Sequence, residues 1–381
     1  MRQKNRFVRV LLVIVSSLVA LIVVLLFLVL PLATRPTRQL SRLAQEWQDR
    51  GSYITWTSTL SENKEFSELN VFTIESGDPS NPAIVLIHGY PTSSFDFHEL
   101  VDLLDDDYFV VAFDTPGYGL SDKPKDGFVY SIFDDALLVE HYVTDVLDLA
   151  SFAMLTHDKG NSVGLALLDL YQAQDAYLIT HHFITNGNIY LPLADLSLFQ
   201  NRLLDERFGP ILTRYVNGHL VARGLADGYF SVPQPDEVIE AIATTIDYDD
   251  GGEVQHATIQ YLAERARFEN RWLETLGASD IPTTLIWGLD DPVAPVRVAD
   301  YVWEEYLVDR QAPAWYRQLE NANHYLQNDQ PEMINLIVRS ALGEAVDVTD
   351  VPAPALSRTA QDAGSRGLGA GNSTPGAGSN Q

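Results

Sequence analysis

Short apolar runs alternate with helix-like segments through the middle of the chain. The runs are continuous, rich in β-branched residues and bounded by turn residues, which is typical of buried strands. We assign strands to five of them: Ala83–His88, Phe109–Phe113, Phe152–Thr156, Tyr177–Thr185 and Thr283–Trp287. Strands that alternate with helices predict a mostly parallel sheet with helices on both faces.

The alternation stops between residues 190 and 277. Helical patterns such as EVIEAIATTI and HATIQYLAERARFENRWL take over in this stretch, which we expect to be mostly helical. Because the strand pattern resumes afterwards, the helical stretch is an insertion within one domain. We therefore predict a core formed by residues 66–189 and 278–345, with residues 190–277 as a helical cap above the sheet.

The N-terminus carries a long apolar segment, VLLVIVSSLVALIVVLLFLVL, from Val10 to Leu30. As a helix it would measure about 30 Å, the thickness of the hydrocarbon core of a bilayer. The alternative is a cleaved signal peptide, but the apolar regions of signal peptides are shorter, roughly 7–15 residues. We predict one uncleaved transmembrane helix as an anchor over residues 10–33, between a basic flank at residues 1–9 and a linker and lead-in to the core at residues 34–65.

The predicted location is therefore a membrane, with the large domain on the non-cytoplasmic side. Four basic residues precede the apolar segment and three follow it closely, so the charge bias towards a cytoplasmic N-terminus is slight. Residues 44–381 hold 18 basic and 52 acidic side chains. A domain this acidic excludes nucleic acid as a partner and is repelled by anionic lipid headgroups, so we expect it to stand off the membrane.

Residues 346–381 are rich in Ala, Gly, Ser and Pro, and this composition predicts a disordered tail.

The chain has no cysteine, which excludes a thiol nucleophile, a zinc finger and an iron–sulfur site. No H-E-x-x-H or comparable spacing indicates a metal site, and we expect no cofactor. Any chemistry therefore depends on oxygen and nitrogen side chains. These gather where the predicted strands end, which is where ligands meet an open α/β sheet.

One such loop reads THDKGNSVG from Thr156 to Gly164. Its last five residues match G-x-S-x-G, which marks a nucleophilic serine on a sharp strand-to-helix turn. The apolar run ends at Thr156, however, so the turn falls on Asp158 and Ser162 lies in the first turn of the helix. In this register Asp158 is the nucleophile and the amide of Lys159 is a donor for an oxyanion. A nucleophilic Ser162 is the alternative.

Three further loops supply possible partners. HGYPTSS begins at His88, and a glycine after a strand lets backbone N–H groups point into a cavity and bind an oxyanion. GLDDP begins at Gly288 and offers an acid, and NANHY begins at Asn321 and offers a base. Of the nine histidines, only His324 lies late enough in the chain and in a suitable loop.

With these loops in place, the chain from about Phe66 to Ala341 resembles the α/β-hydrolase superfamily. Within it, the resemblance is to the epoxide hydrolase and haloalkane dehalogenase branch, which uses an aspartate nucleophile. The strings that carry it are HGYPTSSFDF, DTPGYGLSDKP, THDKGNS, WGLDDPVAP and NANHYLQNDQPE. Four more, YSIFDDA, FITNGNIYLP, GPILTRYV and RFENRW, resemble the mesoderm-specific transcript type of hydrolase, which also begins with a hydrophobic segment.

The resemblance implies a nucleophile at Asp158, a base at His324 and an orienting acid at Asp291. Asp291 is preferred to Asp290 because it holds the G-x-x-D position counted from Gly288. Some dehalogenases place the acid after the preceding strand, but that region here contains no carboxylate.

The resemblance also implies an oxyanion hole at Tyr90 and Lys159, where the chain departs from the dehalogenases. Those enzymes usually place Trp after the nucleophile and Asn or a second Trp elsewhere to bind halide. A charged Lys159 would attract a halide, but without the aromatic N–H donor dehalogenation is a minor alternative. Epoxide hydrolases protonate the opening ring with cap tyrosines, and among five in this cap we select Tyr215 and Tyr261.

We therefore predict a membrane-anchored hydrolase that uses water to cleave a small apolar substrate through an ester on Asp158. Haloalkane dehalogenation and an esterase or lipase activity through Ser162 are alternatives within enzymes. A non-catalytic binding protein on the same fold is the alternative outside them. The deciding observation is whether Asp158, Asp291 and His324 converge within hydrogen-bonding reach.

Overall fold

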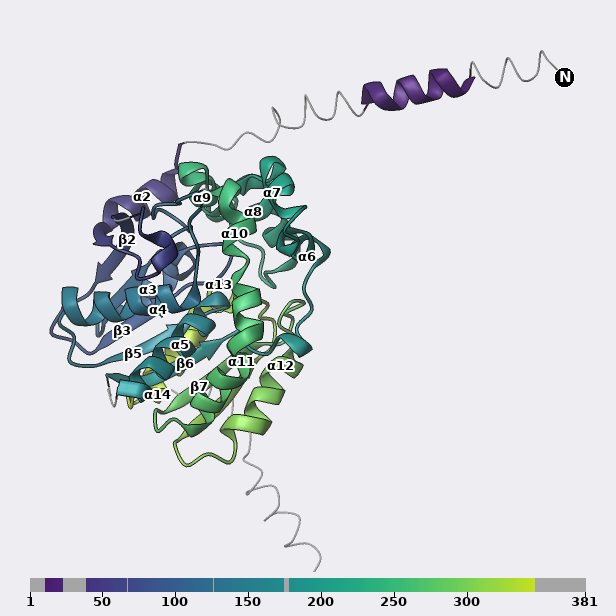
Figure 1. The fold of residues 1–381 in the computed structure, drawn as a ribbon. Helices are drawn as coiled ribbons and strands as arrows, with labels where there is room; N and C mark the ends of the chain where they lie inside the picture. The colour runs from purple at the N-terminus through teal and green to yellow at the C-terminus, as the bar shows by residue number, and fades with distance from the viewer. Residues whose placement is uncertain (1–10, 23–38, 67, 126, 175–177, 347–381) are drawn as a thin grey trace, which may run out of the picture.

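The computed structural model describes residues 11–22, 39–66, 68–125, 127–174 and 178–346 (Figure 1). Its core is an eight-stranded sheet with the order β1-β2-β4-β3-β5-β6-β7-β8. The β1–β2 and β2–β4 pairs are antiparallel, and all the other pairs are parallel. The strands are β1 (Ser52–Trp56), β2 (Leu69–Ser76), β3 (Ala83–Ile87), β4 (Phe109–Phe113), β5 (Phe152–Thr156), β6 (Ile179–Thr185), β7 (Thr283–Gly288) and β8 (Ala314–Leu319).

Helices cover both faces of the sheet because the central strands are buried on both sides. In β3, Ile84 and Leu86 enter one hydrophobic cluster, while Val85 and Ile87 enter the other. Successive side chains of a strand point to opposite faces, so one strand feeds both clusters. The first cluster packs against α3 (His98–Leu104) and α14 (Pro331–Ala341), and the second packs against α4 (Ile132–His141), α5 (Lys159–Gln174), α11 (Tyr261–Ala278) and α12 (Val296–Val302). The predicted α/β arrangement with a mostly parallel sheet is confirmed.

A helical layer lies between β6 and β7 in the sequence and stands at the carboxyl end of the parallel strands (Figure 1). It occupies the region where we expected the cap. Its helices are α6 (Leu198–Leu204), α7 (Gly209–Leu212), α8 (Gly218–Gly228), α9 (Asp236–Asp247), α10 (Gln255–Thr258) and α11. The short α13 (Leu326–Asp329) follows the loop that carries His324.

The sheet begins earlier in the chain than the sequence indicated. Residues 34–65, the predicted linker, contain α2 (Arg42–Arg50) and the edge strand β1. Most β1 side chains are exposed, so this strand lacks the continuous apolar run by which the central strands were recognised. β2 and β8 were not predicted either, and exposed or half-buried residues interrupt both.

Of the predicted anchor, residues 11–22 are helical and their side chains are exposed. The rest of residues 10–33, the basic flank at 1–9 and residues 347–381 of the predicted tail lie outside the described residues. Within the part of the chain that the structure describes, no helix is both long and apolar enough to cross a membrane.

Candidate active site

Asp158 occupies a sharp turn between β5 and α5. Its φ of 49° lies in the left-handed region, which non-glycine residues rarely adopt and which is frequent at active sites. Glycines allow the close approaches around it: a Cβ on Gly89 would lie 2.5 Å from the Cβ of Asp158, and one on Gly187 would lie 2.6 Å from its Cα. The turn therefore lifts the Asp158 carboxylate above the end of the sheet, in the geometry of a nucleophile elbow.

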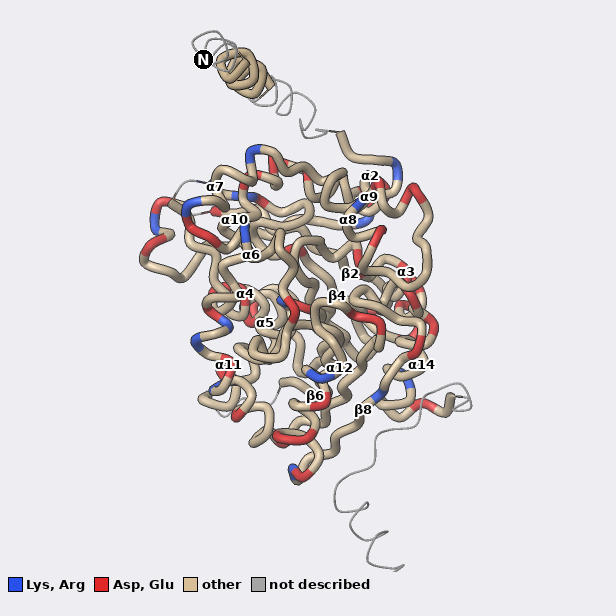
Figure 2. The backbone as a smooth tube through the Cα atoms, turned by 90° about the vertical axis from the view of Figure 1, so that its right-hand side faces the viewer, with Lys and Arg blue, Asp and Glu red and all other residues tan. Residues whose placement is uncertain are grey.

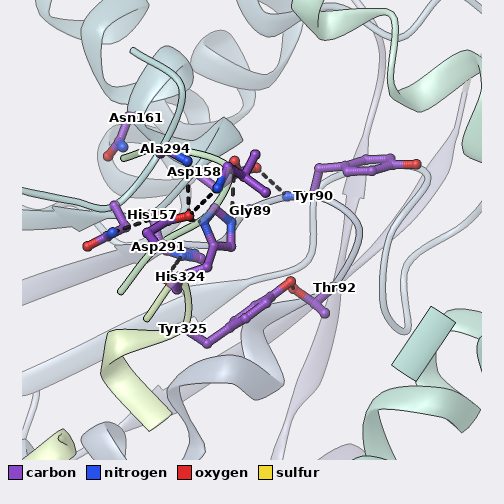
Figure 3. A network of polar contacts seen from close by, with 12 residues as sticks. Gly89, Tyr90, Thr92, His157, Asp158, Asn161, Asp291, Ala294, His324 and Tyr325 are labelled. Carbon is purple, nitrogen blue, oxygen red and sulfur yellow. Dashed lines mark hydrogen bonds and ion pairs between the residues drawn. The ribbon is translucent and has the colours of Figure 1, made fainter. Parts of the chain in front are cut away.

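Groups from three parts of the chain converge on this carboxylate. The Tyr90 amide donates to Asp158 Oδ1 at 2.9 Å, and the Tyr261 hydroxyl donates to the same oxygen at 3.3 Å. His324 Nε2 lies 3.7 Å from Oδ2 (Figure 3). All four residues are buried. An amide, a hydroxyl and an imidazole thus surround the two carboxylate oxygens of Asp158.

Asp291 holds His324 from the other side of the ring, as Figure 3 shows. His324 Nδ1 and Asp291 Oδ2 are 2.8 Å apart. The other Asp291 oxygen accepts the amides of Val293 and Ala294 at 2.8 and 2.9 Å, and Asn186 Nδ2 donates to Oδ2 at 2.8 Å. With its acceptor positions filled in this way, Asp291 fixes the orientation of the imidazole.

The two members of this pair shift each other's protonation. Burial acts to raise the pKa of Asp291, but the neighbouring His324 and the hydrogen-bond donors outweigh it and the pKa is lowered. Burial acts to lower the pKa of His324, but Asp291 and then Asp158 outweigh it and raise that pKa to about 9. In the resting site His324 is therefore a cation between two carboxylates.

The Lys159 side chain turns away from Asp158. Its Nζ lies 2.5 Å from Asp135 Oδ2 and 3.0 Å from Thr115 Oγ1, and it sits 4.4 Å from the centre of the Tyr118 ring. Our suggestion that this ammonium would attract a halide is wrong, because a buried carboxylate already neutralises it. The Lys159 amide is different: at the first position of α5 it has no partner within the helix, so it can bind an oxyanion together with the Tyr90 amide.

The remaining predicted residues fall in different places. Ser162 lies within α5, and its buried Oγ has no hydrogen-bond partner among the described residues, whereas His324 is directed at Asp158. His157 Nε2 donates to the backbone oxygen of His324 at 2.9 Å, which braces the base loop. Tyr215 ends the short η5 turn (Thr213–Tyr215) of the cap and is half-buried. Tyr261, the other selected tyrosine, contacts Asp158 through its hydroxyl.

Sequence reasoning missed three residues around the site. Asn186 was noted only as a position without a carboxylate, yet it binds Asp291. The Tyr229 ring centre lies 6.0 Å from that of His324, although nothing in the local sequence separates this tyrosine from the other four in the cap. Asp96 is fully buried below the site and accepts from Thr92 Oγ1 at 2.5 Å, and burial raises its pKa well above the usual value.

Arg265, on the cap helix α11, is a fourth residue that sequence reasoning missed. It is fully buried, and its guanidinium nitrogens have no hydrogen-bond partner among the residues that the structure describes. Burial lowers the pKa of Arg265 to about 10, opposed by Tyr261, Asp158 and Glu269. Because residues four apart share a helix face, Arg265 lies on the same side of α11 as Tyr261 and places a positive charge in the field of Asp158.

A cavity of about 350 Å³ lies between the cap and the core and reaches Tyr90 and His324. Aliphatic and aromatic side chains of the cap and the core make up most of its wall, and the cap contributes Phe199, Leu220 and Leu225. Such a wall suits an apolar ligand. No group of three or more His, Cys, Asp and Glu side chains in the described part of the chain is arranged to hold a metal ion.

Comparison with known proteins agrees with this fold. A family model described as alpha/beta hydrolase fold matches residues 82–176. The putative hydrolase LipZ of Mycobacterium tuberculosis (strain ATCC 25618 / H37Rv) is 33% identical over 292 residues, covering 76% of this chain and 94% of LipZ. The mesoderm-specific transcript homolog protein of Homo sapiens is 33% identical over 270 residues, covering 68% of this chain and 77% of that protein.

A solved structure of haloalkane dehalogenase DbeA from Bradyrhizobium elkani USDA94 superposes with a TM-score of 0.61 at 20% identity, covering 77% of this chain and 98% of that one. The chain belongs to the α/β-hydrolase family and is a hydrolase. Within that family its relatives include the mesoderm-specific transcript proteins and a haloalkane dehalogenase of Psychrobacter cryohalolentis, as its motifs predicted.

Proposed function

We propose that the protein is an epoxide hydrolase-like enzyme that cleaves a small apolar substrate through an ester on Asp158. The observation that carries the proposal is the position of His324, with Nδ1 2.8 Å from Asp291 and Nε2 3.7 Å from Asp158. A base held this way faces the carbonyl of any ester formed on Asp158. The three side chains therefore lie together as catalysis requires. A protein that only binds a ligand would not need this arrangement.

In the first step, ionised Asp158 attacks an electrophilic ring carbon, and the bond from that carbon to the epoxide oxygen breaks. Tyr261, whose hydroxyl already contacts Asp158, donates its proton to the departing oxygen. Burial and then Asp158 hold the pKa of Tyr261 well above the usual value, so the hydroxyl is neutral and able to donate at physiological pH. The product of this step is an alkyl ester of Asp158.

In the second step, water attacks the ester carbonyl. Formation of the ester has removed one of the carboxylates that raise the pKa of His324, so the imidazole releases its proton to solvent more readily and can deprotonate the water. It takes a proton back from solvent once Asp158 is ionised again. The amides of Tyr90 and Lys159 bind the oxyanion, a contribution of roughly 3–4 kcal/mol per donor in comparable sites. Collapse releases the second hydroxyl with a proton from His324, and the proton that Asp158 sheds on ionising restores Tyr261.

An oxygen leaving group suits this site better than a halide. A departing alkoxide needs a proton, which the Tyr261 hydroxyl supplies. A departing halide needs a fixed cationic or N–H donor that faces the cavity. The Lys159 ammonium is occupied by Asp135 at 2.5 Å, and the buried guanidinium of Arg265 does not line the cavity. Haloalkane dehalogenation is therefore the second candidate, supported by the relatives of that name, and Ser162-dependent ester cleavage is the third.

Labelled water tests the proposed intermediate. In a single turnover in heavy-oxygen water, with enzyme in excess, the mechanism places the label on Asp158 and leaves the first product unlabelled. Digestion and mass spectrometry of the peptide that contains Asp158 gives the readout. A labelled first product with unlabelled enzyme would overturn the ester mechanism. A panel of epoxides, haloalkanes and carboxyl esters identifies the substrate with which to run it.

We also propose that residues 10–33 anchor the enzyme in a membrane, with the catalytic domain on the non-cytoplasmic side. The 21-residue apolar run supports this, as do the helical conformation and exposed aliphatic side chains of residues 11–22. Extraction of membranes at alkaline pH should leave the full chain in the pellet, and release into the supernatant would refute the anchor. Protection of the domain from protease in sealed vesicles tests the orientation.

A further inference from the structure

Exposed apolar side chains gather on one part of the cap. Ten large hydrophobic residues are exposed among the described residues of 39–346, and six of them lie within residues 198–232. Leu198 is 73% exposed, and Phe208, Ile211 and Leu220 are 53–54% exposed. These come from α6, α7 and α8, so three consecutive helices present apolar groups to solvent. Such a concentration marks a surface that contacts another apolar phase.

The charge of this part of the cap differs from that of the rest of the domain. Residues 198–228 carry four arginines and three acidic residues, whereas residues 44–381 as a whole have a net charge of −34. Figure 2 shows blue and red segments interspersed near α6 and α7. The repulsion from anionic headgroups that we expected of the whole domain is therefore absent from this patch, and arginines beside apolar groups are suited to the headgroup layer.

The cavity of the candidate active site opens at the same surface. Phe199 and Leu220 belong to its wall and are also exposed, while Tyr90 and His324 form its inner end. An apolar path therefore leads from the α6–α8 surface to the proposed base, His324, and to Tyr90, whose amide binds the proposed nucleophile. A substrate with an aliphatic chain would follow this path without crossing water.

The N-terminal segment joins the folded domain on the cap as well. The Ser41 amide donates to Thr244 Oγ1 in α9 at 3.1 Å, and Arg42 at the start of α2 pairs with Glu237 in α9 at 2.5 Å. The eight steps of chain between residue 33 and Ser41 span at most about 29 Å. A domain of this size is about 50 Å across, so the tether is too short for the domain to turn its cap away from a membrane that holds residues 10–33.

We infer that the α6–α8 surface of the cap rests on the lipid bilayer and that the substrate enters the active site from the membrane, as a lipid-like molecule with an uncharged reactive group. This inference rests on the proposed membrane anchor and goes beyond it, because an anchored domain could equally stand off the surface. It replaces our expectation, drawn from net charge, that the whole domain stands off the membrane.

The absence of cysteine from the sequence makes a direct test simple. Single cysteines at Phe208 or Ile211, which lie outside the cavity wall, are labelled with a fluorophore in the otherwise unchanged full chain. Val146 is the matched control, an apolar residue 45% exposed at the far end of the sheet, beyond α4. Each protein is reconstituted in phosphatidylcholine–phosphatidylglycerol vesicles with or without a doxyl-labelled lipid, which quenches only fluorophores within the bilayer.

We expect the doxyl lipid to reduce fluorescence about twofold at positions 208 and 211, because an interfacial surface inserts roughly 5–10 Å, and to leave position 146 unchanged. If the protein floats with the vesicles but all three positions are quenched equally and weakly, the anchor is supported and the inference about the cap surface is wrong. Protein that fails to float would refute the anchor and the inference together. Shielding from aqueous iodide without doxyl quenching would mean that protein, not lipid, covers the surface.

A second variant separates docking from anchoring. Phe208→Asp combined with Ile211→Asp places charge on the exposed surface without touching the core, and Val146→Asp is its control. With a label at Leu198, also exposed on α6, the double variant should lose the doxyl quenching and still float with the vesicles. Quenching that survives the double variant would contradict a docking role for this surface.

Discussion

The Tyr261 hydroxyl in the cap donates to Asp158 Oδ1 in the core at 3.3 Å, which joins the two layers at the atom proposed to carry out the chemistry. Tyr261 is the first residue of α11, the long helix that returns the chain from the cap to the sheet. Any displacement of the cap therefore moves the proposed acid relative to the nucleophile.

Replacement of the proposed nucleophile should abolish turnover. Asp158→Asn removes the ionised oxygen that forms the ester, and we expect steady-state activity to fall by at least about 10³-fold. Ser162→Ala, with its side chain buried inside α5, should keep most of the activity. The reverse pattern, with Ser162→Ala inactive and Asp158→Asn active, would show that the enzyme is a serine hydrolase.

Removal of the base should trap the ester. His324→Gln leaves Asp158 free to attack but provides no base for water, so the peptide that contains Asp158 should gain the mass of the substrate. Intact-protein mass spectrometry detects this gain within one turnover. Unmodified His324→Gln enzyme after incubation with a substrate that the wild type consumes would argue against a covalent step.

Removal of the proposed acid should slow ring opening selectively. Tyr261→Phe keeps the ring in place and deletes the hydroxyl, and loss of a general acid typically costs 10²–10⁴-fold. We expect a loss of about 10²-fold in the rate of ester formation on an epoxide. Tyr215→Phe is the matched control in the cap and should remain within a few-fold of wild type. Rapid-quench measurement of ester formation distinguishes the two, and equal losses would remove Tyr261 from this role.

Stability should decline as pH rises through the titration of His324. The folded pKa of about 9 lies above the ordinary value of 6.5, because Asp291 and Asp158 favour the cation against the opposing effect of burial. The stabilisation is therefore fully present below pH 6.5 and is lost as pH rises through about 9. Thermal melts between pH 6.5 and 9 should show a steeper fall in Tm for the wild type than for His324→Gln. Parallel curves would contradict the raised pKa.

The buried Arg265 should reduce stability and support activity at once. Its unpartnered guanidinium is expensive to bury, so Arg265→Met should increase the free energy of unfolding by about 1–4 kcal/mol in denaturant melts. The same change removes a positive charge near Asp158, and ester formation should slow. Arg267→Met, exposed on the same helix, should leave both quantities nearly unchanged. A variant that is destabilised would indicate that Arg265 has a structural partner.

The sequence alone determined the parallel core and the chemical order of the site. Five strands were recognisable because the central strands of such a sheet are buried on both faces and so appear as continuous apolar runs. The turn at Asp158 was recognisable because the run of β5 ends at Thr156 and leaves two residues before α5 begins. These features depend on neighbours in sequence, and a local pattern therefore reveals them.

Only the tertiary structure decided where the long side chains of the site point. Lys159 pairs with Asp135, 24 residues earlier, and Tyr261 meets Asp158 across 103 residues. The packing of α2 on α9 of the cap likewise joins segments about 200 residues apart. Contacts at such separations are fixed by how whole elements pack, because the periodicity within each element specifies which face is buried but not which partner covers it.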